Sequence, residues 1–300
     1  IELWLGLWIV KVSLKIFLVI NNKYSYYCKK LKVKGKVVII TGASSGIGEA
    51  LAYEFALAGS KIVLGARNQE KLISIAEDIR NRGGEAVYCQ SDVSNENDCR
   101  NLVLTAMDNY GQVDILINNA GISMRALFKD VDLSVIKRLM DVNFWGTVYS
   151  TKYALPYILK QKGSIVGISS IAGIVGLPAR IGYSASKFAL NGFLESLRTE
   201  NIKNGLHVLI AYPGFTSSNI RETSLGPSGN PQGESPRNEN KMMTSEQVAK
   251  RTYIAIKNRK NKIVLTTEGK LVSIISKFMP NILYKLVYKS LAKEPNSPFK

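Results

Sequence analysis

The sequence predicts an α/β protein in which one doubly wound, seven-stranded parallel sheet carries helices on both faces within a single domain. Short apolar, β-branched runs alternate with longer amphipathic stretches, a pattern typical of right-handed βαβ units. A glycine-rich turn joins the first apolar run directly to the first amphipathic stretch. The chain has 300 residues, 46% hydrophobic and 21% charged, which is enough to bury one large core.

The strands are predicted in chain order from the apolar runs. Residues 37–41 form the first, an apolar run bounded by glycines that suits a strand buried on both faces. The six runs that follow are KIVLGA, EAVYCQ, VDILINNAG, GSIVGISS, HVLIAYPG and KIVLTT. One helix is predicted directly after the first run, and a second follows KIVLGA and ends at Arg82. Further helices are predicted over 95–110, over 133–160, over about 182–204 and over 245–257.

Three segments are expected along the chain. Residues 36–268 form the α/β domain, preceded by an apolar and basic segment, 1–35, and followed by a basic amphipathic segment, 269–300. Residues 215–243 are rich in Gly, Pro, Ser and Asn and follow the end of a strand, where open α/β sheets bind ligands. We expect a substrate lid there; the alternative is a surface insertion without function.

Charge and residue counts exclude several classes of function. The net charge of +17 is concentrated at the ends, with eight lysines and one glutamate in residues 1–36 and six lysines and one glutamate in residues 270–300. This distribution, without a nucleic-acid-binding motif, argues against a nucleic-acid partner. Three cysteines without a Cys-x-x-Cys pair favour a reducing compartment. The single histidine, His207, lies in an apolar run, so we expect neither a Ser-His-Asp triad nor a metal site.

The two ends of the chain leave alternatives open. Residues 1–20 are apolar but contain Lys11 and Lys15, so they are read as an anchor or as an extension of the reading frame. In the C-terminal segment Ile282, Leu283, Leu286 and Val287 share one helical face, and lysines occupy another. That helix either lies on an anionic membrane or packs on the protein itself.

A glycine-rich turn, TGASSGIG at 41–48, predicts a dinucleotide site. Its glycines allow a tight turn, a close approach of the backbone to a pyrophosphate, and close packing of the helix on the sheet. The helix N-terminus adds unpaired N–H groups and the positive end of the helix dipole. The expected contacts are Gly42, Ser44, Ser45, Gly46, Ile47 and Gly48.

The end of the second strand indicates which dinucleotide binds. An acidic residue there would hold the 2′-hydroxyl of the adenosine ribose in NAD(H). This chain reads VLGARN at that place, with no carboxylate and with Arg67, whose guanidinium suits a 2′-phosphate. We therefore expect NADP(H), with NAD(H) as the alternative.

A tyrosine and a lysine one helical turn apart, Tyr183 and Lys187 in YSASK, are the candidate catalytic pair. The same spacing occurs at Tyr26 with Lys30 and at Tyr253 with Lys257, so only context can select one. A free phenol has a pKa near ~10, and a lysine on the same helix face favours its ionised form.

Six motifs, in order, set that context: TGASSGIG, NNAG at 118–121, Asn143 in DVNFWG, the serine pair 169–170, YSASK, and Pro213–Gly214. Together they resemble the short-chain dehydrogenase/reductase family, in its single-domain, Rossmann-fold oxidoreductase form, over about residues 35–267. The resemblance implies that Tyr183 is the general acid/base, that Lys187 also binds the nicotinamide ribose, and that Asn143 holds a proton-relaying water. It implies that Ser170, thirteen residues before the tyrosine, orients the substrate carbonyl together with Tyr183.

The resemblance also implies further cofactor contacts. Asp92 and Val93 match positions that border the adenine, and Asn119 matches a residue beside the cofactor. Pro213 and Gly214 precede a position where the family often has a threonine that touches the carboxamide. Ser218 stands near that place in this chain.

These features predict an NADP(H)-dependent carbonyl reductase or alcohol dehydrogenase with a small, hydrophobic or lipid-like ketone or alcohol as substrate. The alternative is a non-catalytic nucleotide-binding scaffold or redox sensor of the same fold. The resemblance implies a homodimer or homotetramer. We expect a cytoplasmic protein, with peripheral contact to a membrane's cytoplasmic face as an open question.

Overall fold

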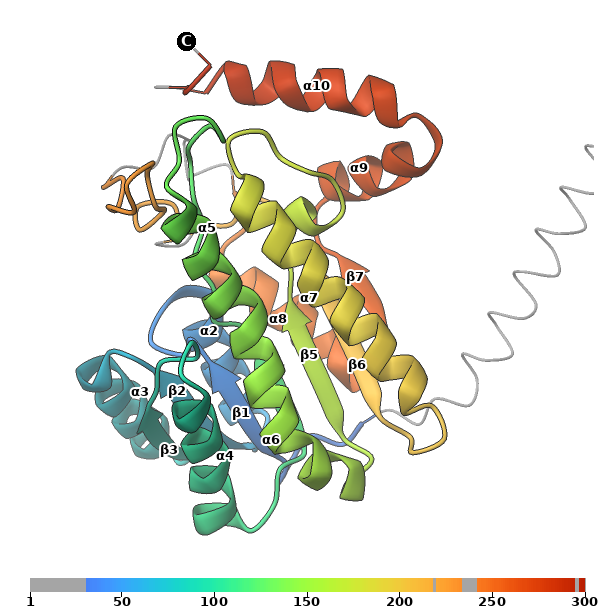
Figure 1. The fold of residues 1–300 in the computed structure, drawn as a ribbon. Coiled ribbons are helices and arrows are strands. Elements are labelled where there is room, and N and C mark those ends of the chain that lie inside the picture. The colour runs from blue at the N-terminus through green and yellow to red at the C-terminus, as the bar shows by residue number, and fades with distance from the viewer. Residues whose placement is uncertain (1–30, 218–219, 234–241, 295–296, 300) are drawn as a thin grey trace, which may run out of the picture.

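The computed structural model describes residues 31–217, 220–233, 242–294 and 297–299 (Figure 1). The strands are β1 (Val37–Thr41), β2 (Lys61–Ala66), β3 (Glu85–Gln90), β4 (Ile115–Asn118), β5 (Ser164–Ile168), β6 (His207–Tyr212) and β7 (Lys262–Val264). The helices are α2 (Gly46–Leu57), α3 (Gln69–Asn81), α4 (Glu96–Tyr110), α5 (Leu133–Met140), α6 (Gly146–Lys160), α7 (Ile181–Glu200), α8 (Ser245–Lys257), α9 (Thr267–Phe278) and α10 (Pro280–Ala292). The short elements are a π-helical turn, η1 (Asp141–Trp145), and a 3-10 turn, η2 (Ile171–Gly173).

The seven strands form one parallel sheet in the order β3-β2-β1-β4-β5-β6-β7. The predicted fold class is therefore confirmed. From β1 the chain adds β2 and then β3 on one side of β1. It then crosses to β4, which pairs with β1 on the other side. Ligands of doubly wound sheets bind outside the carboxyl ends of the strands at such a reversal. The glycine turn at 42–48 and the NNAG segment follow the two strands that meet there.

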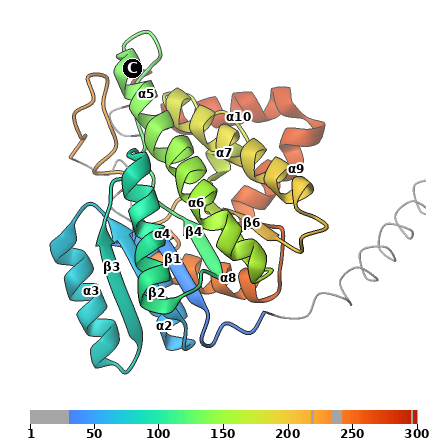
Figure 2. The same ribbon diagram turned by 60° about the horizontal axis from the view of Figure 1, so that its bottom comes forward.

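Alternate residues of each strand point into two separate cores. Val38 and Ile40 of β1 pack in the core that α2, α3 and α8 cover, and Val37 and Ile39 pack in the core that α4, α6 and α7 cover. The views in Figures 1 and 2 show these two helical layers on opposite faces of the sheet. Burial on both faces explains why the strands read as continuous apolar runs.

The run predicted as one helix over 133–160 is interrupted in the structure. Helix α5 ends at Met140, the π-helical turn η1 follows, and α6 begins at Gly146. A π turn widens the helix by one residue and re-aims the side chains within it, and such turns occur frequently at functional sites. Asn143 lies in this turn and is fully buried.

The region expected as a lid packs on the loop between β4 and α5. The Leu225 backbone accepts a hydrogen bond from Arg125 and donates one to Ser123, and Asp132 donates to the Pro227 carbonyl. The Leu225 side chain is buried in a small apolar cluster with Met124 and Leu139, against which Tyr183 packs. Part of this region, 218–219 and 234–241, lies outside the described residues.

The C-terminal segment forms two helices, α9 and α10, that lie across the end of the molecule where the strands have their carboxyl ends (Figure 1). Leu283 and Leu291 of α10 are buried, whereas Ile282 and Leu286 are about half exposed. The apolar face expected at 282–287 is therefore divided between buried and exposed residues. Within the described residues, no helix has the length and apolarity needed to cross a membrane.

Candidate active site

The turn between β1 and α2 has the backbone form that a dinucleotide site requires. Gly42 and Gly46 adopt positive φ, 64° and 56°, which side chains with a Cβ disfavour. A Cβ on Gly48 would lie 2.2 Å from the Gly42 carbonyl oxygen, so the helix can start this close to the turn only with glycine. Ser45 is the N-cap residue of α2, and its side chain makes no capping hydrogen bond. The N-terminus of α2 thus lacks a side-chain cap, and uncapped N–H groups at a helix N-terminus can bind an anion.

Asn119 fixes this turn from the neighbouring strand. Its side-chain amide donates to the carbonyl oxygens of Thr41 and Gly42, at 3.0 and 3.2 Å. The Thr41 hydroxyl accepts from the backbone N–H groups of Asn119 and Ala120, both at 3.0 Å. Asn119 therefore helps to fix the shape of the glycine turn through hydrogen bonds to its backbone.

The carboxyl ends of β2 and β3 place the residues expected to meet the adenosine half. Arg67 follows β2, its side chain is exposed, and its backbone carbonyl accepts from the Gln90 amide. The Asp92 carboxylate accepts from the backbone and hydroxyl of Ser94, at 3.0 and 2.7 Å. Val93 is buried against the start of α6, where a Cβ on Gly146 would lie 2.8 Å from it. Arg67, Asp92 and Val93 thus line one edge of the sheet.

Ser170, Tyr183 and Lys187 lie together on the other side of the reversal point. Ser170 follows β5 and is the N-cap of η2, where its hydroxyl accepts from Ala172 N–H at 3.2 Å. The Ser170 and Tyr183 hydroxyls also share a hydrogen bond. The Lys187 side chain is 3% exposed, its Nζ donates to the Ile168 carbonyl at 2.9 Å, and it lies 5.7 Å from the centre of the Tyr183 ring.

Burial dominates the titration of both residues of the YSASK pair. Desolvation raises the pKa of Tyr183, while the hydrogen bond from Ser170 and the positive charge of Arg180 lower it. Desolvation also lowers the pKa of Lys187 from 10.5 to about 8, because burial disfavours the charged ammonium. The tyrosine is thus protonated at neutral pH, and the charge that reduces its pKa comes from Arg180.

Asn143 is held rigidly beside this group. Its carbonyl oxygen accepts from Ile122 N–H at 2.8 Å, and its amide donates to the Ile122 carbonyl and the Ser186 hydroxyl at 3.0 and 2.9 Å. A Cβ on Gly121 would lie 3.2 Å from Asn143 Oδ1 and 3.4 Å from Lys187 Nζ. The two polar groups therefore converge on the same glycine of the NNAG segment.

Pro213 and Gly214 follow β6 and border the same space. The Pro213 carbonyl accepts from Ile171 N–H at 3.3 Å, and a Cβ on Gly214 would meet the Thr266 side chain at 2.8 Å. Ser218, the last expected cofactor contact, lies outside the described residues.

Other polar groups have structural roles. His207 in β6 shares a hydrogen bond with Ser164 at 2.9 Å, and its burial lowers its pKa to about 4, so it is neutral at physiological pH. Tyr253, of the second Tyr-x-x-x-Lys pair, packs edge-on against Phe55 in the core. The Tyr26 and Lys30 pair lies outside the described residues. In the described ranges no group of three His, Cys, Asp or Glu side chains is placed to hold a metal ion.

A sequence comparison decides the family. The family model described as "short chain dehydrogenase" matches residues 36–226, which include both the glycine turn and the YSASK helix. The chain belongs to the short-chain dehydrogenase family. The expectation drawn from the six motifs is thereby confirmed.

Among short-chain dehydrogenase sequences, one similar relative is the 11-beta-hydroxysteroid dehydrogenase-like 2 protein of Arabidopsis thaliana. It is 45% identical over 190 residues, which are 63% of this chain and 61% of the relative. The 11-beta-hydroxysteroid dehydrogenase A of Sesamum indicum is 42% identical over 192 residues, 63% of this chain and 55% of the relative. The match thus spans little more than half the length of these curated relatives.

Two solved structures share the fold. A short-chain dehydrogenase/reductase from Burkholderia phymatum, in complex with NAD, has a TM-score of 0.75 and 24% identity, and the match covers 84% of this chain and 96% of that one. An alcohol dehydrogenase from the archaeon Thermococcus sibiricus, complexed with 5-hydroxy-NADP, has a TM-score of 0.66 and 23% identity, over 77% and 95% of the two chains.

Three residues around the candidate site were missed by the sequence reasoning. Arg180 lies three residues before Tyr183, and that spacing, which places both on one helix face, could have identified it. Glu294 contacts Arg180 from the far end of the chain, and no sequence pattern links the two. Ser186, which accepts from Asn143, lies inside YSASK and was passed over.

Proposed function

We propose that the chain is an NADP(H)-dependent oxidoreductase that interconverts a ketone and a secondary alcohol. The observation that carries the proposal is the shared position of the Ser170 hydroxyl, the Tyr183 phenol and the Lys187 ammonium beside the reversal point of the sheet. The relative from Arabidopsis thaliana, named a hydroxysteroid dehydrogenase-like protein, supports a reaction at a carbinol carbon.

The proposed chemistry follows from what each side chain can do. The Ser170 hydroxyl donates a hydrogen bond to the carbonyl oxygen of the substrate, on which negative charge develops during reduction. Tyr183 transfers its phenolic proton to that oxygen, and its raised pKa keeps the proton in place at neutral pH. In the reverse direction the phenolate removes the alcohol proton, and the Arg180 charge favours that phenolate.

Lys187 and Asn143 complete the proton path. The buried Lys187 ammonium, with a pKa of about 8, can release or accept a proton near physiological pH. Asn143 Oδ1 and Lys187 Nζ converge on Gly121, where a water between them would be one link between the lysine and bulk solvent, the source of the proton. We propose that this connection restores the proton on Tyr183 after each turnover.

The residues around the reversal point fit a nicotinamide dinucleotide. The uncapped start of α2 and the positive-φ glycines would hold its pyrophosphate, and Asp92, Val93 and Asn119 would border its adenine and ribose. Pro213 and Gly214 would border the nicotinamide, beside Lys187. When bound, the dinucleotide supplies or accepts the hydride; the protein's own groups manage the proton.

The preference for NADP(H) is assigned to Arg67. Its exposed guanidinium follows β2, where no carboxylate would repel a 2′-phosphate. Replacing Arg67 by glutamine should raise the Kd for NADPH at least ~10-fold and leave the Kd for NADH unchanged, because only NADPH carries the phosphate. Fluorescence titration with both cofactors measures this, and equal losses for NADPH and NADH would contradict the assignment.

A screen of carbonyl compounds tests the reaction. Oxidation of NADPH by ketones is expected for the wild type and should be at least ~100-fold slower in Tyr183→Phe, which removes only the hydroxyl. The second candidate, a non-catalytic nucleotide-binding scaffold, predicts NADPH binding without consumption of any carbonyl in the screen. Ser169→Ala is the matched control, because that hydroxyl is buried next to Ser170 and has no hydrogen-bond partner.

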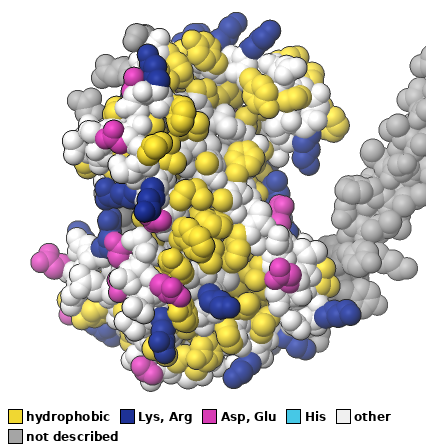
Figure 3. Space-filling model, viewed as in Figure 1, with side chains coloured by type: hydrophobic (Ala, Val, Ile, Leu, Met, Phe, Trp, Pro, Cys, Tyr) yellow, Lys and Arg dark blue, Asp and Glu magenta, His cyan; other side chains and the backbone are white. Residues whose placement is uncertain are grey.

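A hydrophobic substrate and membrane contact are proposed together. Large apolar side chains of α9 and α10 are exposed, among them Leu271, Ile274, Phe278, Ile282 and Leu286. Lysines flank them, and Figure 3 shows Lys and Arg side chains along the edge of the molecule over α10. An apolar strip edged by lysines is complementary to an anionic lipid surface. An enzyme placed there would meet lipid-like ketones or alcohols.

Liposome co-sedimentation tests the membrane contact. Phe278→Ser with Ile282→Ser should release the protein from vesicles that contain phosphatidylserine, and neutral vesicles should bind less than anionic ones. Leu57→Ser is the control, because Leu57 is 88% exposed on α2, remote in sequence from this strip. Equal pelleting of the wild type and the double variant would contradict the contact.

We also propose a homodimer or homotetramer. Exposed Trp145 and Phe188 lie on η1 and α7, and Figure 3 shows apolar side chains gathered on the face of the molecule near α6 and α7. A patch of this kind is typical of an interface. Light scattering should give a mass of two or four chains, and a monomer in the wild type would contradict the proposal.

A further inference from the structure

Three charged side chains from distant parts of the chain meet in the protein interior. The Arg180 and Arg125 guanidiniums both contact Glu294 Oε2, at 3.2 and 3.5 Å. The three side chains are 10%, 8% and 4% exposed, so the contact is shielded from water. Removing one partner of a buried ion pair leaves an uncompensated charge in a medium that solvates it poorly.

Each member belongs to a segment that borders the candidate site. Arg125 follows β4, and its backbone pairs with Leu225 of the 215–243 region. Arg180 is the N-cap residue of α7, three residues before Tyr183. Glu294 follows α10, so its ion pairs connect the C-terminal segment to the loop that contains Arg125 and to the loop that ends at Arg180.

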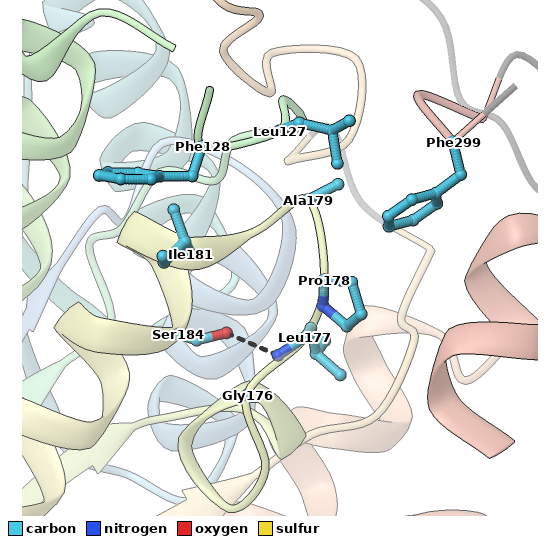
Figure 4. A pocket seen from close by; sticks show the side chains of 9 residues that line it. All are labelled: Leu127, Phe128, Gly176, Leu177, Pro178, Ala179, Ile181, Ser184 and Phe299. Carbon is cyan, nitrogen blue, oxygen red and sulfur yellow. Dashed lines mark hydrogen bonds between the residues drawn. The ribbon is translucent and has the colours of Figure 1, made fainter. Parts of the chain in front are cut away.

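The same segment also forms one wall of a hollow beside these loops. A cavity of about 400 Å³ is lined by Leu127, Phe128, Pro178 and Ile181 from the two loops and by Phe299 from the C-terminal segment. Figure 4 shows Phe299 facing this hollow from the side opposite Phe128 and Ile181. The position of the C-terminal segment therefore contributes to the shape of the hollow at the start of α7, which Ile181 and Ser184 also line.

We propose that Glu294 is a positioning residue, whose carboxylate between Arg125 and Arg180 holds the C-terminal segment across the candidate site and sets the charge beside Tyr183. The inference rests on the proposed function for the meaning of Tyr183. Glu294 touches neither substrate nor cofactor in this proposal. It acts through Arg180.

The charges around Tyr183 determine the expected effect. On α7 they are Lys187 in the next turn and Arg180 at the N-cap. The Ser170 hydroxyl, at the start of η2, is hydrogen-bonded to the phenol, and Tyr183 packs against the apolar cluster that includes Met124, Leu139 and Leu225. Glu294 and Arg125 lie beyond Arg180. Glu294 therefore offsets the one guanidinium that favours the phenolate.

Two variants separate positioning from a merely structural role. Glu294→Gln removes the negative charge and leaves Arg180 uncompensated, which should lower the pH at which Tyr183 ionises by about half a unit or more. Arg180→Gln removes the positive charge and should raise it by a similar amount. Both variants weaken the attachment of the C-terminal segment. If Glu294 had only a structural role, the pH midpoint of Tyr183 ionisation would therefore move in the same direction in both variants.

The ionisation of Tyr183 is measured by NMR on protein labelled at the tyrosine Cζ, with Tyr183→Phe for assignment. This readout does not need turnover, so it remains informative if the proposed reaction is wrong. Hydrogen exchange of residues 280–294 is the second readout, and we expect at least tenfold faster exchange in Glu294→Gln. Glu294→Asp, which keeps the carboxylate, should restore both readouts in large part.

Lys293→Gln is the matched control, because it changes the net charge by one at the neighbouring, exposed position. It should alter neither readout. Unchanged exchange in Glu294→Gln, or midpoints that move the same way in Glu294→Gln and Arg180→Gln, would overturn the proposal. Circular dichroism verifies that every variant is folded.

Discussion

Replacing Lys187 by methionine should make the protein more stable while it removes the candidate site's ammonium. The Lys187 side chain is 3% exposed, and burial lowers its pKa from 10.5 to about 8. At pH 7 the folded protein therefore carries a charged group in a place that disfavours charge. A methionine side chain of similar length fills the same space without that cost.

The magnitude follows from the shift in pKa. A depression from 10.5 to about 8 corresponds to about 3 kcal/mol of destabilisation at pH 7. Methionine also loses the hydrogen bond from Nζ to the Ile168 carbonyl, which is worth about 1 kcal/mol. The expected net gain in the free energy of unfolding is about 2 kcal/mol.

The gain should depend on pH in a defined direction. Lys187 has a lowered folded-state pKa, so between about pH 8 and 10.5 the unfolded chain binds more protons than the folded one. Wild-type stability therefore rises with pH in that window, relative to Lys187→Met. By pH ~9.5 the cost of the buried charge falls to about 1 kcal/mol, and most of the variant's advantage should disappear.

Urea unfolding of both proteins at pH 7 and pH 9.5 measures this difference. Lys152→Met on α6 is the control, because that lysine is exposed and should give no comparable gain. A variant that is less stable than the wild type at pH 7, with a difference that does not change with pH, would refute the reasoning about burial.

Two further predictions concern the fold. Burial lowers the pKa of His207 from 6.5 to about 4, so the wild type should lose about 3 kcal/mol more than His207→Gln as the pH falls from 6.5 to 4, measured by urea unfolding. Equal acid sensitivity would contradict this. Gly48→Ala should abolish NADPH binding and cost at least about 1–3 kcal/mol, because its Cβ would lie 2.2 Å from the Gly42 carbonyl oxygen. Gly192→Ala, with open space at an exposed turn of α7, should instead gain up to ~1 kcal/mol; calorimetry and cofactor titration compare the two.

The sheet could be predicted because strands buried on both faces leave a strong signal. All five residues of β1 are buried, and the run stands out as continuous apolar sequence. The glycine turn was equally readable, since Gly42 and Gly46 adopt a backbone form that only glycine takes easily. In both cases the physical constraint acts on neighbouring residues of the chain.

The interruption between α5 and α6 could not be predicted. Residues 133–160 keep a helical pattern throughout, and the π turn at Asn143 depends on hydrogen bonds to Ile122 and Ser186 from other segments. The residue that lowers the pKa of Tyr183 in the structure also differs from the one expected from the sequence. Spacing along α7 indicated Lys187, whereas burial reduces that lysine's own pKa and Arg180 supplies the charge that lowers the pKa of Tyr183.

The contacts of the C-terminal segment lay furthest from what a sequence can show. Glu294 meets Arg125 and Arg180 across more than a hundred residues of chain. Helical periodicity identified α10 but could not decide which apolar residues would be covered. In the structure Leu283 and Leu291 are covered, while Ile282 and Leu286 are not.

The most direct test of the central claim is a tracer experiment with NADPH deuterated at the transferring position, a ketone identified in the carbonyl screen, and both the wild type and Tyr183→Phe. For the wild type, mass spectrometry should find one deuterium on the carbinol carbon of the alcohol. Tyr183→Phe should bind NADPH with the wild-type Kd and form the deuterated alcohol at least ~100-fold more slowly. Formation at the wild-type rate by Tyr183→Phe would contradict the assignment of Tyr183 as the proton donor.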